Sequence, residues 1–113
     1  MPKASKETRI KNEKRRLLEI FQDADGNQLA VATPLIERMA FTNVSLQDLE
    51  EDLARDGWVE EYQNGREQSG LKKSSAADCY ISLTKNLTAM TKTLLELTPP
   101  AQRKSRLAEM MGK

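Results

Sequence analysis

One stretch of the sequence, residues 74–98, carries a repeat of apolar residues that constrains the fold more than any other feature. Its apolar side chains recur at alternating spacings of three and four residues. The repeat consists of Tyr80, Leu83, Leu87, Met90, Leu94 and Leu97. This spacing places all of them on one face of a long helix, as in the seam of a coiled coil. We therefore predict that this seam forms a helix–helix contact and supports self-association.

Both ends of this helix are signalled in the sequence. Ser75 can cap the first free backbone amides, and Asp78 follows three residues later, as in a capping box. Pro99 and Pro100 stop the helix at its other end. A second stripe beside the seam is only half apolar. We therefore expect the helix to contact two neighbours, one of which comes from elsewhere in the chain.

Two further helices are predicted before this stretch. Residues 5–22 are dense in helix formers and have a short apolar stripe, mainly in their second half. A longer helix ends at Gly57, a good left-handed cap. Its start lies between Asn27 and Thr33, because Thr33 and Pro34 are themselves a favourable cap and first position. The positions predicted to be buried along it are Ile36, Met39, Leu46, Leu49 and Leu53. Asn43 interrupts this apolar line, and we interpret it as a residue that sets helix register.

The connection between the two long helices contains a turn signal. Asn64 and Gly65 favour a type I′ turn, and Val59 and Tyr62 suit a small two-stranded ribbon, with an irregular extended excursion as the alternative. We interpret Trp58 and Tyr62 as anchors of this connection, although aromatic residues can also stack on bases. Either connection permits the long helices to lie antiparallel.

The predicted fold class is therefore all-α. We expect a long antiparallel helical hairpin, with a basic N-terminal helix and a short C-terminal helix, that assembles as an oligomer. The expected organisation is a basic helical segment over residues 1–26, a hairpin oligomerisation core over 27–98 and a tail helix over 99–113. A chain of 113 residues with 38% hydrophobic and 4% aromatic residues is lean for a compact core, which favours long helices and a core shared between subunits.

Charge is distributed unevenly, although the net charge is only +1. Residues 1–16 are strongly basic, residues 23–61 are mainly acidic, and positive charge predominates again after Pro100. The N-terminal cations are Lys3, Lys6, Arg9, Lys11, Lys14, Arg15 and Arg16. Clustered cations supply the electrostatic part of DNA affinity, so we predict that these residues contact phosphates. The alternative for the N-terminal segment is a solvated end that contacts no phosphate. We interpret the acidic run as a solvated face that meets a basic neighbour.

The composition excludes several common kinds of catalytic and metal site. The chain has no histidine and one cysteine, Cys79. The usual His/Cys metal sites, Ser–His or Cys–His nucleophile pairs and an internal disulfide therefore cannot form. We expect no enzymatic activity, no cofactor and no metal, and we interpret Cys79 as a small buried residue. Neither a signal-like apolar run nor a membrane-spanning one is present, so we expect a cytoplasmic protein.

Five short segments occur in one order along the chain: LIERMAF, EEYQNG, KKS, TKN and LLELTPPA. With the basic leading helix, this arrangement resembles the small terminase subunits of tailed phages and prophages of Gram-positive hosts, over residues 14–106. The resemblance implies a non-enzymatic protein in the cytoplasm of the bacterial host. Such a protein assembles as a ring, recognises double-stranded viral DNA and passes it to the large terminase subunit, which carries the ATPase and nuclease.

The resemblance also gives an expectation for the C-terminal segment, which in this family contacts the large subunit or the portal machinery. Residues 101–113 have a small apolar stripe and a basic surface. We predict that they lie apart from the core and dock on the large subunit through Arg103, Arg106, Leu107 and Met110. The alternative for this segment is packing against its own or a neighbouring hairpin. The alternative for the whole protein is a structural helical adaptor oligomer that binds proteins and not DNA.

Overall fold

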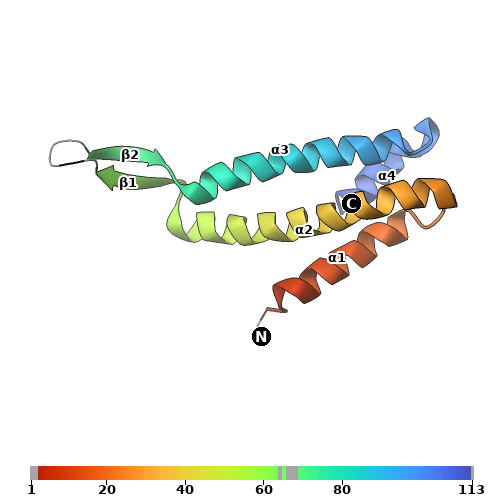
Figure 1. Cartoon of the computed structure of the whole chain (residues 1–113), viewed down its shortest axis with the longest axis horizontal. Helices are drawn as coiled ribbons and strands as arrows, with labels where there is room; N and C mark the ends of the chain where they lie inside the picture. The colour runs from red at the N-terminus through yellow and green to blue at the C-terminus, as the bar shows by residue number, and fades with distance from the viewer. Residues whose placement is uncertain (1–2, 64, 66–68, 113) are drawn as a thin grey trace.

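The computed structural model describes residues 3–63, 65 and 69–112. Within this part, the helices and strands run in the order α1 (Lys6–Ile20), α2 (Gly26–Asp56), β1 (Val59–Gln63), β2 (Ser69–Lys73), α3 (Ser75–Glu96), the 3₁₀ turn η1 (Pro100–Gln102) and α4 (Arg103–Met110). Helices α2 and α3 lie side by side and antiparallel, α1 packs along α2, and α4 folds back near the junction of α1 and α2 (Figure 1). The molecule is elongated, with extents of 62 × 34 × 23 Å.

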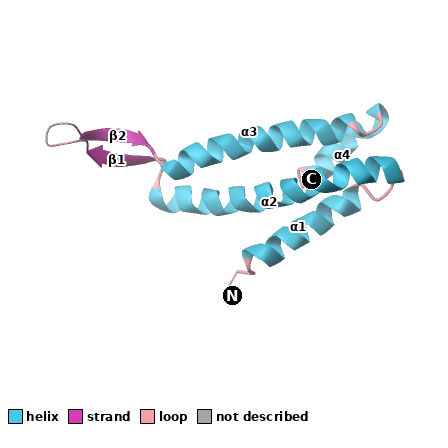
Figure 2. Ribbon diagram, in the orientation of Figure 1, coloured by secondary structure: helices cyan, strands magenta, loops and turns pink. Residues whose placement is uncertain are grey.

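The predicted helical hairpin with a leading and a trailing helix is confirmed. All-α describes this fold only approximately, because the connection between α2 and α3 is a two-stranded antiparallel ribbon (Figure 2). Of the two predicted connections, the ribbon and the irregular extended excursion, the structure has the ribbon. The Asn64 position of the predicted type I′ turn lies outside the described residues. Among the described residues, no helix combines the length and the apolar character needed to cross a membrane.

Helix α2 begins earlier than predicted. Its first residue is Gly26, one residue before the predicted interval, because the side chain of Asp25 caps it by accepting from the backbone N–H of Gln28 at 2.8 Å. Pro34 therefore lies inside the helix instead of starting it. The other end agrees with the prediction, since Gly57 has a φ of 84° and its N–H donates to the carbonyl of Leu53. Positive φ of this kind favours glycine.

The cap of α3 is Ser74 and not Ser75. The Ser74 hydroxyl accepts from the backbone N–H of Ala77 at 3.0 Å. Asp78 does not close the predicted capping box; its carboxylate lies 3.2 Å from the Lys73 ammonium, still in the first turn, where negative charge suits the helix dipole. The predicted cap position is therefore one residue too late. Strand β2 ends at Lys73, so the next residue, Ser74, already caps the helix.

The core lies where all four helices meet, at the end of the hairpin remote from the ribbon. It consists of Leu17, Phe21, Ala32, Ile36, Met39, Ala40, Leu94 and Met110. On α2, four of the predicted positions are buried and Leu49 is half-buried, whereas Val44, which lies off the predicted line, is buried. In the predicted seam of α3, Leu94 is fully buried and the other members are half-buried. The seam therefore serves first as an intramolecular contact with α2.

The C-terminal segment belongs to the core. Met110 is 6% exposed and packs in the same cluster as Leu17 of α1 and Phe21, the residue that caps α1. The prediction that residues 101–113 lie apart from the core is therefore wrong. The prolines at 99 and 100 reverse the chain direction through η1, so that they return α4 to the helices instead of separating it from them.

Candidate nucleic-acid and subunit interfaces

Most of the cations predicted to contact DNA have acidic partners within the chain. Lys3 lies 2.7 Å from Glu51 and 3.3 Å from Asp48, and both carboxylates belong to α2. Arg9 contacts Asp48 at 2.6 Å and donates to the side-chain oxygen of Gln47 at 3.0 Å. These contacts join the start of α1 to the acidic face of α2. The acidic run does face a basic neighbour, but that neighbour is in the same chain.

The ion pairs change the protonation of the groups that form them. Hydrogen bonding from Arg9, and then from Lys3, lowers the pKa of Asp48 below its ordinary value. The hydrogen bond to Glu51 raises the pKa of the Lys3 ammonium. Both shifts favour the charged forms, as expected for partners in contact. At neutral pH this part of α1 is therefore held to α2 and its positive charge is compensated.

A polar network continues along the contact between α1 and α2. Glu13 accepts two hydrogen bonds from Arg16, at 2.6 and 3.2 Å, and a third from the side-chain amide of Asn43, at 2.8 Å. Asn43, interpreted from the sequence as a register-setting residue, thus bonds to α1. Hydrogen bonding by Glu13 raises the pKa of the Arg16 guanidinium. Lys14 lies 3.0 Å from Glu37 of α2.

The outer face of α1 is different, because its cations Lys11 and Arg15 are exposed and are not paired with carboxylates of the described residues. Their spacing of four residues places them on one face of the helix, turned away from α2. With Lys14, Leu18, Glu19 and Gln22 they line a shallow hollow of about 470 Å³. Of the predicted phosphate-contacting residues, this pair is the best placed.

A second surface is an apolar groove between α2 and α3, with a volume of about 590 Å³. It is lined by Glu37, Arg38, Phe41, Thr42, Leu83, Asn86, Ala89 and Met90. The Phe41 side chain is 53% exposed, and the Lys6 ammonium lies 5.1 Å from the centre of its ring. Leu83 and Met90 belong to the predicted oligomerisation seam, so part of that seam opens into the groove. Phe41 was not among the predicted interface residues, because it lies off the apolar line of its helix.

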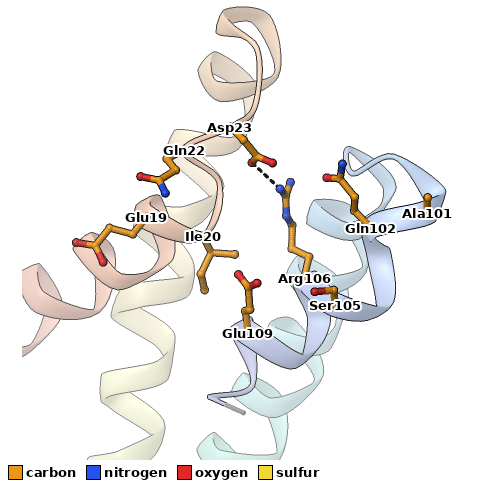
Figure 3. Close-up of a pocket in the computed structure, with 9 residues that line it drawn as sticks. All are labelled: Glu19, Ile20, Gln22, Asp23, Ala101, Gln102, Ser105, Arg106 and Glu109. Atoms are coloured by element: carbon orange, nitrogen blue, oxygen red, sulfur yellow. Dashed lines mark hydrogen bonds and ion pairs between the residues drawn. The ribbon is translucent and has the colours of Figure 1, made fainter.

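Arginines hold α4 against the residues around the end of α1. The Arg106 guanidinium lies 2.6 Å from the Asp23 carboxylate (Figure 3). It also stacks 4.7 Å from the centre of the Phe21 ring. Arg16 of α1 donates to the carbonyl oxygens of Glu109 and Met110, each at 3.0 Å. These bonds satisfy carbonyls that a helix C-terminus leaves free. Helices α1 and α4 therefore form one unit.

Most of the residues predicted to dock on the large subunit instead make contacts within the chain. Arg106 and Met110 are buried, and Arg103 donates to the carbonyls of Leu95 and Thr98, each at 3.0 Å. Leu107 remains accessible on the outer face of α4, as does Met111 just beyond it. The polar pocket of about 400 Å³ between α1 and α4, drawn in Figure 3, is lined by Glu19 of α1 and Glu109 of α4, among others. Docking through Leu107 stays a prediction.

Two smaller interpretations can be compared with the structure. Cys79 is exposed, so its interpretation as a buried residue is wrong. Trp58 stacks edge-to-face on Tyr80 of α3, with 5.6 Å between the ring centres, and thereby anchors the base of the ribbon, as predicted. Within the described residues, no group of three or more acidic or cysteine side chains is placed to hold a metal ion.

Comparison of the chain with protein-family models, with curated proteins and with solved structures gave no match. The open basic face of α1 and the apolar groove, together with the resemblance of the short segments, are therefore the basis for the functional proposal.

Proposed function

We propose that this protein is a small terminase subunit, a non-enzymatic, self-associating component of phage genome packaging. In this proposal it binds double-stranded viral DNA through the outer face of α1 and recruits the large terminase subunit. The observation that carries the proposal is the exposed pair Lys11 and Arg15, which has no acidic partner among the described residues. Phosphate contacts require cations of this kind, because a cation already paired with a carboxylate contributes little to DNA affinity.

The proposal narrows the predicted DNA contact. Lys3, Arg9 and Arg16 are engaged within the chain and are assigned to positioning α1. Lys11 and Arg15 are assigned to phosphate contact, with Lys14 beside them. Two or three cations per subunit give weak binding by themselves. Self-association compensates for this, because several subunits that engage one duplex together bind with a much higher avidity than one subunit alone.

Self-association is supported by the groove between α2 and α3. Its lining is predominantly apolar, and it leaves Phe41 exposed beside the half-buried Leu83 and Met90, at the surface of a chain with a small core. Exposed apolar surface of this kind is typical of protein interaction sites. We assign it to contact with another subunit. Leu107 and Met111, exposed at the outer face of α4, are assigned to the large subunit.

The second candidate is a structural adaptor oligomer that binds no DNA. The observation in its favour is the internal compensation of charge, since Lys3, Arg9 and Lys14 all pair with carboxylates of α2. In this case the basic N-terminal segment serves folding alone, and the groove and α4 bind other proteins. Duplex binding at low salt separates the two candidates.

The experiment is a titration of a fluorescently labelled duplex with the full chain, followed by anisotropy at low salt. The test variant is Lys11→Glu with Arg15→Glu. Its control is Lys85→Glu with Lys92→Glu, the same change of charge at exposed residues of α3 that face away from α2. The proposal predicts a loss of affinity of at least about tenfold for the test variant and a small change for the control. No duplex binding by the parent chain would favour the adaptor.

A further inference from the structure

The ribbon of β1 and β2 projects beyond the helices, and within the described residues neither strand pairs with a third strand (Figure 1). All residues of the two strands except Gly70 are exposed. A two-stranded ribbon has little stability of its own, and its free edges can pair with further strands. The ribbon can therefore accept a further strand at either edge.

The register of the ribbon identifies the backbone groups that are available at its edges. The N–H of Ser74 donates to the carbonyl of Trp58 at 3.0 Å, and Val59 is opposite Lys73. Because hydrogen-bonded and non-hydrogen-bonded pairs alternate in an antiparallel ladder, the pair Glu60 and Lys72 exchanges hydrogen bonds. The N–H and C=O groups of the alternate residues point outward. These residues are Val59, Glu61 and Gln63 on β1, and Ser69, Leu71 and Lys73 on β2.

The two edges have opposite charge. Strand β1 carries Glu60 and Glu61, whereas β2 carries Lys72 and Lys73. The ammonium of Lys72 lies 3.4 Å from Glu60 across the ribbon. Glu61 is opposite Leu71, which is apolar, and it makes no ion pair within the described residues. An acidic edge with an uncompensated carboxylate thus lies on one side of the ribbon and a basic edge on the other.

The two faces of the ribbon differ as well. On one face the ring of Tyr62 lies against Gly70, so closely that a Cβ atom at position 70 would be 3.1 Å from the ring. The other face carries Val59, which is 56% exposed, and Leu71, which is 68% exposed. Glu61 and Lys73 lie on this same face, because residues two apart on a strand point to the same side. The apolar and the charged contacts can therefore be made together.

We propose that β1 of one copy of this chain pairs with β2 of a second copy, so that the ribbons form a continuous sheet across subunits. The acidic edge then meets the basic edge, and Glu61 lies next to Lys73 of the adjoining copy. Pairing of like edges would bring carboxylates against carboxylates or ammonium groups against ammonium groups, which is unfavourable. The contact is therefore head-to-tail, the kind that generates rings when the rotation closes. This proposal adds a named subunit contact to the proposed function and rests on its self-association, not on DNA binding.

The test uses charge reversal in the full-length chain, with association measured by analytical ultracentrifugation. Glu61→Lys places two ammonium groups against each other at the proposed contact with Lys73 of the adjoining copy, and Lys73→Glu places two carboxylates against each other there. Each variant alone should associate about tenfold more weakly than the parent. A mixture of the two, and the chain that carries both changes, should recover association. Parent-like association of both single variants, or a mixture that fails to recover, would overturn the proposal.

Two controls separate this contact from other effects. Asp78→Asn removes the partner of Lys73 within the chain without changing the strand edges, and it should leave association unchanged. Circular dichroism should show parent-like helix content for every variant. Duplex binding is measured separately on the Glu61→Lys variant, with Lys11 and Arg15 intact. Weaker association together with weaker but retained DNA binding supports the strand contact. If association responds as proposed but the chain binds no DNA, the strand contact is supported and the DNA-binding function is rejected.

Discussion

The guanidinium of Arg9 lies 2.6 Å from the carboxylate of Asp48 and joins α1 to the acidic face of α2. Lys3 contacts the same carboxylate. Because these residues are separated by about 40 positions in the sequence, the pairing is a tertiary contact that fixes the position of α1. It also determines which cations of the basic N-terminal segment remain exposed, namely those on the opposite face of the helix.

The Arg9–Asp48 contact predicts a dependence of stability on pH. The pKa of Asp48 is lowered in the folded chain by Arg9 and Lys3. A carboxylate of this kind stabilises the fold above its unfolded pKa, and the stabilisation is lost as the pH falls through the folded pKa. We expect a loss below about pH 4 that is smaller in the Asp48→Asn variant. Since about a third of the side chain is exposed, the difference should be below about 1 kcal/mol. Urea unfolding between pH 3 and 7 measures it, and identical pH profiles for parent and variant would contradict it.

Replacing Arg106 should destabilise the fold. This side chain is 7% exposed, pairs with Asp23 and covers the Phe21 ring. We expect Arg106→Ala to lower the free energy of unfolding by about 2 kcal/mol, because it removes a charge-assisted hydrogen bond and packing together. Lys104→Ala, an exposed neighbour on the same helix, is the control and should change it by less than about 0.5 kcal/mol. Equal effects of the two changes, measured by urea unfolding, would contradict the assigned role of Arg106.

Deleting residues 103–113 should also destabilise the chain. The deletion removes Met110 from the core and leaves Leu17 and Phe21 partly uncovered. Truncating a buried methionine alone costs about 2–5 kcal/mol, so a loss of at least about 2 kcal/mol is expected. Thermal unfolding followed by circular dichroism measures it, with deletion of residues 112–113 as the control. An unchanged thermal midpoint would show that α4 is dispensable for the fold.

The apolar groove should contribute to self-association. We expect Phe41→Asp to weaken association at least about tenfold, since a charge placed in an apolar interface is left without a partner. Stability of the isolated chain should change little, because the Phe41 side chain is already half exposed. Val31→Asp is the matched control, an exposed apolar residue of the same helix that does not line the groove. Sedimentation velocity across a concentration series reports the result, and equal behaviour of the two variants would remove the groove from the interface.

Local signals in the sequence predicted the helices well. The seam of α3, the cap at Gly57 and the ribbon all follow from spacing or turn chemistry, and their positions agree with the structure to within about a residue. The start of α2 is less predictable, because Thr33 and Pro34 form an equally good local start signal. Asp25 caps the helix earlier, and Pro34 is accommodated inside it.

The non-local contacts were not predictable in the same way. The composition of residues 101–113 is compatible with either docking outward or packing inward. What decides between them is a set of contacts from α1, the Arg16 bonds to the end of α4 and the pairing of Asp23 with Arg106. Likewise, the N-terminal charge cluster gave no indication of which cations meet the acids of α2. Those pairings depend on how α1 packs, which no local pattern encodes.

The salt dependence of duplex binding tests the central claim most directly. The logarithm of the association constant should fall linearly with the logarithm of salt concentration for the parent chain. For Lys11→Glu with Arg15→Glu, loss of two phosphate contacts per bound subunit should reduce the slope by about 1.8, and Lys85→Glu with Lys92→Glu should keep the parent slope. A parent slope in the α1 variant, or a parent chain that binds no duplex at low salt, would contradict the assignment of DNA binding to the outer face of α1.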